Sequence, residues 1–199
     1  MLSHLRPAIV MTLLFTALTG LAYPLAITAI AQLALGAQAN GGLVERDGKI
    51  VGSALIGQNF SADRYFHGRP SATLGPDPAD PGKSVDAPYN AANSAGSNLG
   101  PTSKKLVDRV NAAIEAEFAA GRIGMVAADA VTTSASGLDP DISPQYALAQ
   151  VPAVAKARDF SQDRVRALVE AHIDNRILGF IGEPRVNVLK LNMALDALK

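Results

Sequence analysis

The part of the sequence best suited to binding a ligand is a run of hydroxyl residues at 132–137 (Thr-Thr-Ser-Ala-Ser-Gly). It precedes a strong helix start, where clustered hydroxyls and free backbone amides can bind an anion. Ser134 and Ser136 are therefore candidate phosphate contacts. Asp139 and Asp141 follow closely, and their charges would repel a phosphate unless a metal ion or an arginine neutralised them. A capped turn without a ligand is the alternative interpretation.

Other signatures of catalysis are weak or missing in this sequence. Gly82-Lys83-Ser84 looks like the end of a phosphate-binding P-loop, but Asp77 stands where the first glycine is required, so a surface turn is the better interpretation. No Gly-x-Ser-x-Gly and no dinucleotide-type glycine triad occurs. The chain has no cysteine and only three histidines, far apart in sequence. We predict no catalytic residue and no metal site.

Charge and length limit the function further. Lysine and arginine together number 18, aspartate and glutamate also 18, and the net charge is zero. Because nucleic-acid binders carry a basic surface, we predict no nucleic-acid partner. The length of 199 residues is enough for one domain with an appended element.

That appended element is an apolar segment near the N-terminus. Residues 7–44 carry no charge, and residues 8–35 are almost continuously apolar. At 1.5 Å per residue this run can cross a hydrocarbon core of about 30 Å. We predict a short tail at 1–7 and one transmembrane helix at 8–34 in a lipid bilayer. Pro24 lies inside this helix and predicts a kink near Tyr23.

A cleaved signal peptide is the rival interpretation of the same segment, since Arg6 supplies a positive start and 37–39 (Ala-Gln-Ala) a small-residue cleavage site. The apolar run is longer than the roughly 7 to 15 residues of a signal core, which favours a retained anchor. Positive charges on the two sides nearly balance, with Arg6 before the helix and Arg46 and Lys49 after it. We expect a cytoplasmic N-terminus and an extracytoplasmic soluble domain.

Residues 40–199 are predicted to form a single soluble domain of mixed α and β type (α+β), because strand and helix patterns interleave. The expected strands are 48–57, 124–133 and 184–188, and the expected helices are 103–120, one beginning at Ser143, 161–177 and a last turn at 193–199. Ser143 is expected to cap its helix, and Pro152 to end or kink it.

A long loop at 61–101 is rich in Pro, Gly, Asn, Ser and Asp and has too little periodicity for a regular element. Its aromatic residues Tyr65, Phe66 and Tyr89, together with Arg69, are untypical of a disordered segment. We expect a loop docked on the rest of the domain.

Several stretches together resemble one known family, the C subunits of the bacterial Kdp potassium-transporting P-type ATPases. The matching stretches are 20–25 (GLAYPL), 57–60 (GQNF), 65–72 (YFHGRPSA), 96–101 (GSNLGP), 131–144 (VTTSASGLDPDISP) and 185–195 (RVNVLKLNMAL). The resemblance covers nearly all of the chain. It implies a single-pass accessory subunit of the cell (inner) membrane, without an active site of its own.

The resemblance also implies partners and a nucleotide. The partners would be a channel-like potassium-translocating subunit, a P-type pump subunit that hydrolyses ATP, and a very small membrane subunit. This family is described as helping the pump to bind ATP, with contacts on glutamine-containing stretches that here correspond to Gln58 or Gln150. Two hypotheses stay open: an assembling, stabilising subunit, and a direct ATP-binding chaperone on the cytoplasmic side that uses Gln150 and the hydroxyl run at 132–137.

Overall fold

The computed structural model describes residues 2–122 and 124–198. The chain forms two compact units, Met1–Val51 and Gly52–Lys199. It contains both helices and small sheets, with one candidate membrane-spanning helix near the N-terminus. The predicted fold class, a mixed α and β domain behind one apolar helix, is confirmed.

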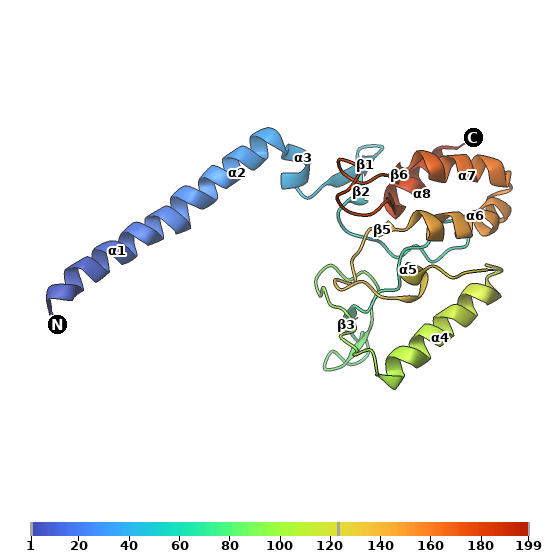
Figure 1. The fold of residues 1–199 in the computed structure, drawn as a ribbon, viewed down its shortest axis with the longest axis horizontal. Helices are drawn as coiled ribbons and strands as arrows, with labels where there is room; N and C mark the ends of the chain where they lie inside the picture. Colours follow the sequence, from blue (N-terminus) through green and yellow to red (C-terminus); the bar gives the residue numbers. More distant parts are fainter. Residues whose placement is uncertain (1, 123, 199) are drawn as a thin grey trace. The chain divides into compact units, whose positions relative to one another are not determined.

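The first unit consists mainly of a long helix (Figure 1). A short 3-10 turn, η1 (Leu2–His4), leads into α1 (Leu5–Ala17), a π-helical segment η2 (Leu18–Ala22) and α2 (Tyr23–Ala34). The 30 residues of Leu5–Ala34 are long and apolar enough to cross a membrane. At 1.5 Å per residue they extend about 45 Å, more than the hydrocarbon core requires.

The π-helical segment Leu18–Ala22 lies directly before Pro24, where the sequence predicted a kink. Proline has no N–H to donate to the carbonyl four residues earlier, and a π-bulge is one way in which a helix accommodates this loss. The hydroxyl of Thr19 donates to the carbonyl of Phe15 at 2.6 Å. The structure therefore shows a local widening of the helix rather than a break.

After α2 the chain forms the short helix α3 (Gly36–Ala39) and the hairpin β1 (Leu43–Arg46) and β2 (Lys49–Ser53). Asp47 and Gly48 connect the strands with positive φ angles of 52° and 74°, as a two-residue hairpin turn requires. The boundary between the two units falls within β2. The predicted strand at 48–57 is therefore correct at its start but ends at Ser53.

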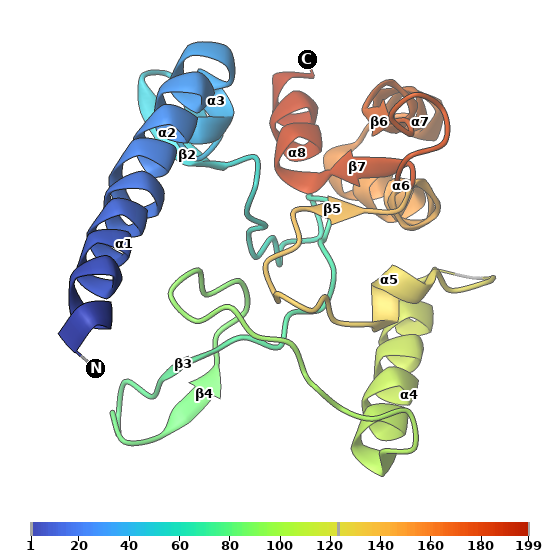
Figure 2. The same ribbon diagram turned by 60° about the vertical axis from the view of Figure 1, so that its left-hand side comes forward.

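The core of the second unit lies between a small sheet and three helices (Figure 2). The antiparallel sheet has the order β5 (Asp141–Ile142), β7 (Arg185–Asn187), β6 (Ile173–Asp174). The helices are α6 (Pro144–Arg158), α7 (Gln162–Ala171) and α8 (Val188–Ala197). Together with Phe66 of the long loop, the most deeply buried apolar side chains come from these elements: Ala147, Val151, Val165, Val169, Val186, Leu191 and Leu195.

The start of α6 was predicted correctly, but the helix does not end at Pro152. The hydroxyl of Ser143 caps the helix by accepting from the N–H of Tyr146 at 3.0 Å, and Pro144 occupies the first turn. The helix continues through Pro152 to Arg158. Val151 and Val154, on both sides of the proline, are buried in the core, so tertiary packing outweighs the local cost of proline.

The helix α7 is shorter than the predicted span of 161–177. It ends at Ala171, and the chain enters β6 at Ile173. The helical period of the predicted span placed Val165, Val169 and Ile177 on one inward face; Val165 and Val169 are fully buried, whereas Ile177 is exposed. The residues beyond 171 follow a helical period in sequence, but pairing with β7 takes them out of the helix.

On the opposite side of this unit from α8, α4 (Lys104–Ala119) leads to the single-turn helix α5 (Ala128–Val131) (Figures 1 and 2). The predicted strand at 124–133 is wrong, because Asp129 on this turn accepts hydrogen bonds from the N–H and the hydroxyl of Ser143 at 2.6 and 3.0 Å. On α4, Val110 and Ile114 pack against the core while Phe118 is half exposed.

The long loop at 61–101 docks on the core and contains a hairpin that the sequence did not predict. Phe66 is fully buried, and β3 (Leu74–Pro76) pairs with β4 (Ser84–Asp86) in an antiparallel register. Thr73, itself buried, joins the hairpin base by donating from its hydroxyl to the carbonyl of Ala87 at 2.6 Å.

Candidate functional site

Two buried side-chain amides hold the backbone of the long loop where it crosses the core. Asn192 on α8 accepts from the N–H of Phe66 at 2.8 Å and donates to its carbonyl at 2.9 Å. Gln150 on α6 does the same for the next residue, accepting from the N–H of His67 at 2.8 Å and donating to its carbonyl at 3.2 Å. We call these four bonds the amide clamp. They replace the strand partner that this buried backbone lacks.

The amide clamp decides what Gln150 can do. Its side chain is 1 % exposed, and both ends of the amide are engaged. A nucleotide base could hydrogen-bond this amide only after the bonds to His67 broke, which would leave two buried backbone groups without partners. Gln150 therefore positions the loop in the structure as it stands.

A cavity of about 440 Å³ lies beside the amide clamp, between α6, the loop and the end of α4. Its lining includes Gln150 and three residues that can carry a positive charge, His67, Arg122 and Lys156. Tyr65 and the exposed Asp63 complete the polar part of the wall. The volume is that of an ordinary small-molecule pocket. Basic side chains beside polar ones suit a ligand that has both an anionic group and an uncharged polar part.

The Tyr65 wall of this cavity is held firmly. The guanidinium of Arg158 lies 4.8 Å from the centre of the Tyr65 ring and donates to Asp196 at 2.6 Å. Arg158 also donates to the carbonyl of Arg64 at 2.8 Å. The stacked cation and the nearly buried ion pair fix the ring from one side.

Arg122 in the same wall forms an ion pair with Glu117, which is itself buried on α4. Burial opposes the charge on Arg122, but the hydrogen bond and the charge of Glu117 outweigh it and raise the pKa of the guanidinium. Arg122 therefore keeps its charge at the edge of the cavity, although its partner already balances it.

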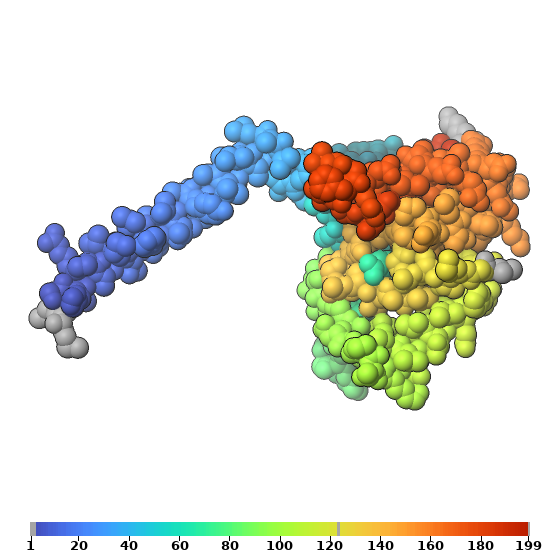
Figure 3. Space-filling view, viewed as in Figure 1, coloured from blue at the N-terminus to red at the C-terminus, as the bar shows by residue number. Residues whose placement is uncertain are grey.

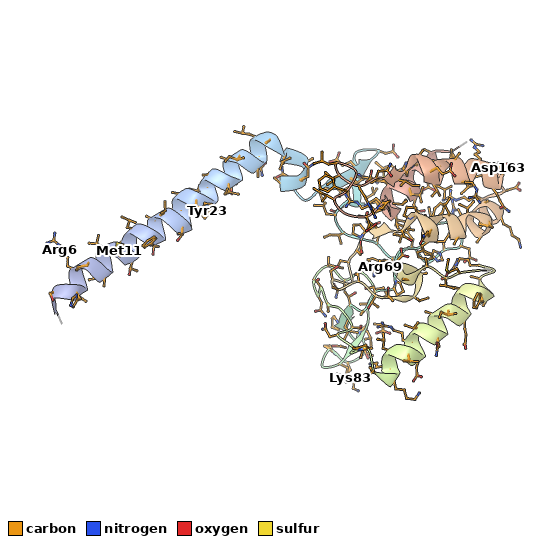
Figure 4. All side chains as sticks on the ribbon, in the orientation of Figure 1. Arg6, Met11, Tyr23, Arg69, Lys83 and Asp163 are labelled. Carbon is orange, nitrogen blue, oxygen red and sulfur yellow. The ribbon has the colours of Figure 1, made fainter. Side chains whose placement is uncertain are left out.

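Arg69 connects the loop to the hydroxyl run at 132–137. Its guanidinium donates to the carboxylate of Asp139 at 2.9 Å and to the hydroxyl of Thr132 at 3.4 Å. Figure 4 shows this side chain among the loops beside α5, whereas Lys83 lies at the periphery of the unit. Arg69 is therefore the arginine that could neutralise Asp139 beside a bound phosphate. Its charge is already used in the internal ion pair with Asp139.

Tyr89 lies next to this pair. Its hydroxyl donates to the carbonyl of Arg69 at 2.7 Å. Burial and, less strongly, the charge of Asp139 raise the pKa of Tyr89 and Arg69 lowers it, and the net result is a pKa of about 12. The phenol therefore remains a neutral donor at physiological pH and supports the loop.

The structure places Ser134 and Ser136 in a closed turn. Ser134 is buried, its hydroxyl is 3.5 Å from that of Ser136, and the Ser136 hydroxyl accepts from the N–H of Leu138 at 3.1 Å. The carbonyl of Ser136 accepts from the N–H of Ala95 at 3.0 Å. These bonds match the interpretation as a capped turn, which the sequence left as an alternative.

Gln58 lies in a third environment, beside Gly52 and Leu189 on α8. A Cβ atom added at Gly52 would stand 3.0 Å from the side-chain carbon of Gln58 and 3.1 Å from a methyl of Leu189. Only Gln150, of the four residues considered for ATP, lines the cavity beside the amide clamp. The structure does not gather the four into one site.

The interpretation of Gly82-Lys83-Ser84 as a surface turn is confirmed, since Lys83 is exposed and pairs with Asp80 at 3.1 Å.

No group of three or more metal-ligating side chains occurs in the part of the chain that the structure describes. The half-buried Asp141 accepts from Asn187 and pairs with Arg185. Burial raises the pKa of Asp141, and the Asn187 hydrogen bond and the Arg185 charge lower it less strongly.

Comparison with known proteins decides the family. The family model described as the c chain of the K+-transporting ATPase, KdpC, matches residues 5–197. This chain belongs to the KdpC family. Proteins named potassium-transporting ATPase KdpC subunit are 61 % identical to it in Bradyrhizobium diazoefficiens, over 98 % of each chain, and in Rhodopseudomonas palustris strain BisB18, over the full length of both. A third, from Methylobacterium nodulans, is 61 % identical over 100 % of this chain and 98 % of its own.

Sequence reasoning missed Asn192, which is the second residue of the amide clamp in this member of the KdpC family. The available signal was an amide between apolar neighbours in the helix pattern at 189–195 (LKLNMAL). A buried polar side chain in such a position needs partners. Only the tertiary structure shows that these partners are the backbone atoms of Phe66.

Proposed function

We propose that this chain is the accessory, non-catalytic subunit of an ATP-driven potassium uptake complex, which it assembles and stabilises. The match to the KdpC family over residues 5–197 is the observation that carries this proposal. The candidate membrane helix Leu5–Ala34 supports an anchored subunit. The relatives are named as subunits of a potassium-transporting ATPase, and a P-type pump subunit, a channel-like subunit and a very small membrane subunit are the proposed partners.

The proposal is tested by omitting this chain when the other subunits are produced together. We expect the complex to fall apart on purification and potassium-stimulated ATPase activity to disappear. A variant lacking residues 52–198 but retaining the helix serves to separate anchoring from the role of the soluble unit. A stable complex with full activity in the absence of this chain would refute the proposal.

The anchor is proposed to cross the membrane once, with the N-terminus in the cytoplasm and the second unit outside. Because the chain has no cysteine, single cysteines report topology directly. Met125, which is 99 % exposed, suits labelling of the second unit by an impermeant reagent on intact cells, and Ser3 is the matched position before the helix. We expect labelling at Met125→Cys only; the reverse pattern refutes the orientation.

In the proposed orientation, the long loop contacts the channel-like subunit near its ion entrance. The loop is docked at Phe66 and His67, whereas its β3–β4 hairpin presents the half-exposed Leu74 and Val85. A photo-cross-linker placed at exposed Lys83, next to this hairpin, should couple to the channel-like subunit. The same label at Lys105, exposed at the start of α4, is the control, and equal coupling at both positions counts against this contact.

A direct ATP-binding role is the second candidate, and the cavity beside the amide clamp is the observation that favours it. His67, Arg122 and Lys156 could face the phosphates there. Because Gln150 is engaged by His67, it would support the cavity rather than contact the base. Gln58, Ser134 and Ser136 would then lie outside the nucleotide contact.

Hydrogen exchange with and without ATP on the full chain tests this second candidate. Protection of residues 63–67 and 150–157, abolished by Lys156→Ala, supports it. Lys105→Ala removes a lysine far along α4 from the cavity and should leave protection unchanged. If ATP protects residues 132–137 or Gln58 instead, the hydroxyl run or the other glutamine is the site. No protection anywhere refutes direct binding.

A further inference from the structure

The connection between β6 and β7 exposes an unusual run of apolar side chains. Within residues 177–181, which we call the apolar tip, Leu178 is 78 % and Phe180 73 % exposed, and Ile177 and Ile181 are exposed as well. Elsewhere in the described part of the second unit, the large exposed apolar residues stand singly or in pairs. In Figure 3 this segment, near the red end of the colour scale, forms a rounded projection on the unit. A patch of this kind marks a contact surface.

The apolar tip is a closed hairpin. The N–H of Ile177 donates to the carbonyl of Ile181 at 3.0 Å, and the reverse bond has the same length. Leu178 and Gly179 make the turn with positive φ angles of 55° and 80°, a conformation that asparagine and glycine favour and leucine does not. The fold thus accepts an unfavourable backbone at Leu178 while leaving this side chain outside the core.

Most backbone N–H groups in the apolar tip have hydrogen-bond acceptors within the hairpin or at its base. Gly179 donates to the carbonyl of Arg176 at 3.1 Å and Phe180 to that of Ile177 at 3.3 Å. Together with the Ile177 and Ile181 pair, four of the five N–H groups have internal partners. A hydrocarbon medium offers no hydrogen-bond partners, so each backbone N–H that is already paired within the segment lowers the free-energy cost of entering it.

Charged residues stand at the base of the apolar tip. Arg176 and Glu183 form an ion pair across the base, and Arg185, which pairs with Asp141 at 3.2 Å, is more than half exposed. Apolar and aromatic side chains ahead of charged ones are typical of segments that lie at a membrane interface. When the apolar tip is immersed, the charged side chains at its base would lie at the level of the lipid headgroups.

The proposed membrane anchor would keep this unit near a bilayer. The candidate membrane helix ends at Ala34 and the second unit begins at Gly52, so the intervening segment reaches at most about 60 Å. Tethering makes contact with the membrane surface effectively intramolecular. We propose that the apolar tip inserts into the interfacial layer of the lipid bilayer and gives the second unit its own, non-spanning membrane contact. This inference rests on the membrane anchor proposed above, but not on the proposed role in the potassium uptake complex.

The test places an environment-sensitive fluorophore on the full chain at Phe180→Cys, in nanodiscs of phosphatidylcholine and phosphatidylglycerol that leave both bilayer faces open. Met125→Cys, an apolar residue of the same unit at 99 % exposure, is the matched control. We expect emission at shorter wavelength for the label at position 180, quenching by a spin label on the lipid chains and protection from aqueous iodide. The label at 125 should behave in the opposite way on all three measurements.

Two results would overturn the inference. Iodide quenching at position 180 equal to that at 125 would mean that the apolar tip stays in water. Protection from both iodide and the lipid-borne quencher would mean that protein covers it, from a second copy of the chain. A second labelled variant, Leu178→Cys, guards against local misfolding at Phe180, and both positions must respond in the same way for the inference to stand.

Discussion

Removing Asn192 from the amide clamp should destabilise the second unit strongly. In Asn192→Ala the buried N–H and carbonyl of Phe66 lose their partners at 2.8 and 2.9 Å. Each unsatisfied buried group costs about 1–3 kcal/mol, so the loss of partners for two groups should lower the free energy of unfolding by roughly 2–6 kcal/mol. That is a large part of the roughly 5–15 kcal/mol that stabilise a domain.

The measurement is urea unfolding of the full chain in detergent, followed by far-ultraviolet circular dichroism, with amide exchange at Phe66 and His67 as the local readout. Asn93→Ala is the matched control, because the exposed Asn93 also donates its amide to a carbonyl, that of Leu74, at 2.9 Å. It should cost less than about 0.5 kcal/mol. A loss in Asn192→Ala no greater than in the control, with unchanged exchange at Phe66, would refute the reasoning.

The same assay separates structure from nucleotide binding at Gln150. Gln150→Ala should destabilise the unit without any nucleotide, because His67 loses both bonds. Since the two amides hold consecutive residues of one segment, the double variant should cost less than the sum of the single ones. Strict additivity would mean that the two amides act independently.

Three further changes can be predicted from the structure. Gly57→Ala should lower the free energy of unfolding by about 1–3 kcal/mol, because its Cβ would stand 2.6 Å from the carbonyl oxygen of Asp139, whereas Gly100→Ala, with nothing within 4 Å, should be nearly neutral in the same urea assay. Asp141→Asn should remove a pH dependence: because burial raises the folded pKa above the ordinary 3.8, the stability of the wild type relative to the variant should fall as the pH rises through that folded pKa, and a flat difference would contradict the assignment. Pro24→Ala restores a backbone donor and should convert Leu18–Ala22 to α-helix, which nuclear magnetic resonance in detergent can follow through the carbonyl shifts of these residues.

Local patterns in the sequence were enough for the candidate membrane helix, the fold class and the family. A long uncharged apolar run, a Ser-Pro helix start at 143–144 and the 3.6-residue period at 104–119 depend on neighbours in sequence, and local energetics control such features. The motifs quoted for the Kdp C subunits depend on sequence alone as well, and the family match over residues 5–197 agrees with them.

Contacts between distant segments decided the rest. The burial of Gln150 and Asn192 depends on residues 83 and 126 positions away, and the failure of the predicted strand at 124–133 depends on Asp129 meeting Ser143. Helical periodicity likewise suggested that Ile177 points inward, while pairing of β6 with β7 places it on an exposed hairpin. The sequence by itself determined which segments are apolar, helical or turn-like, because these preferences are short-range. Only the tertiary structure decided which polar groups are paired inside and which apolar groups remain outside, because each buried donor or acceptor must find its partner wherever the chain brings one.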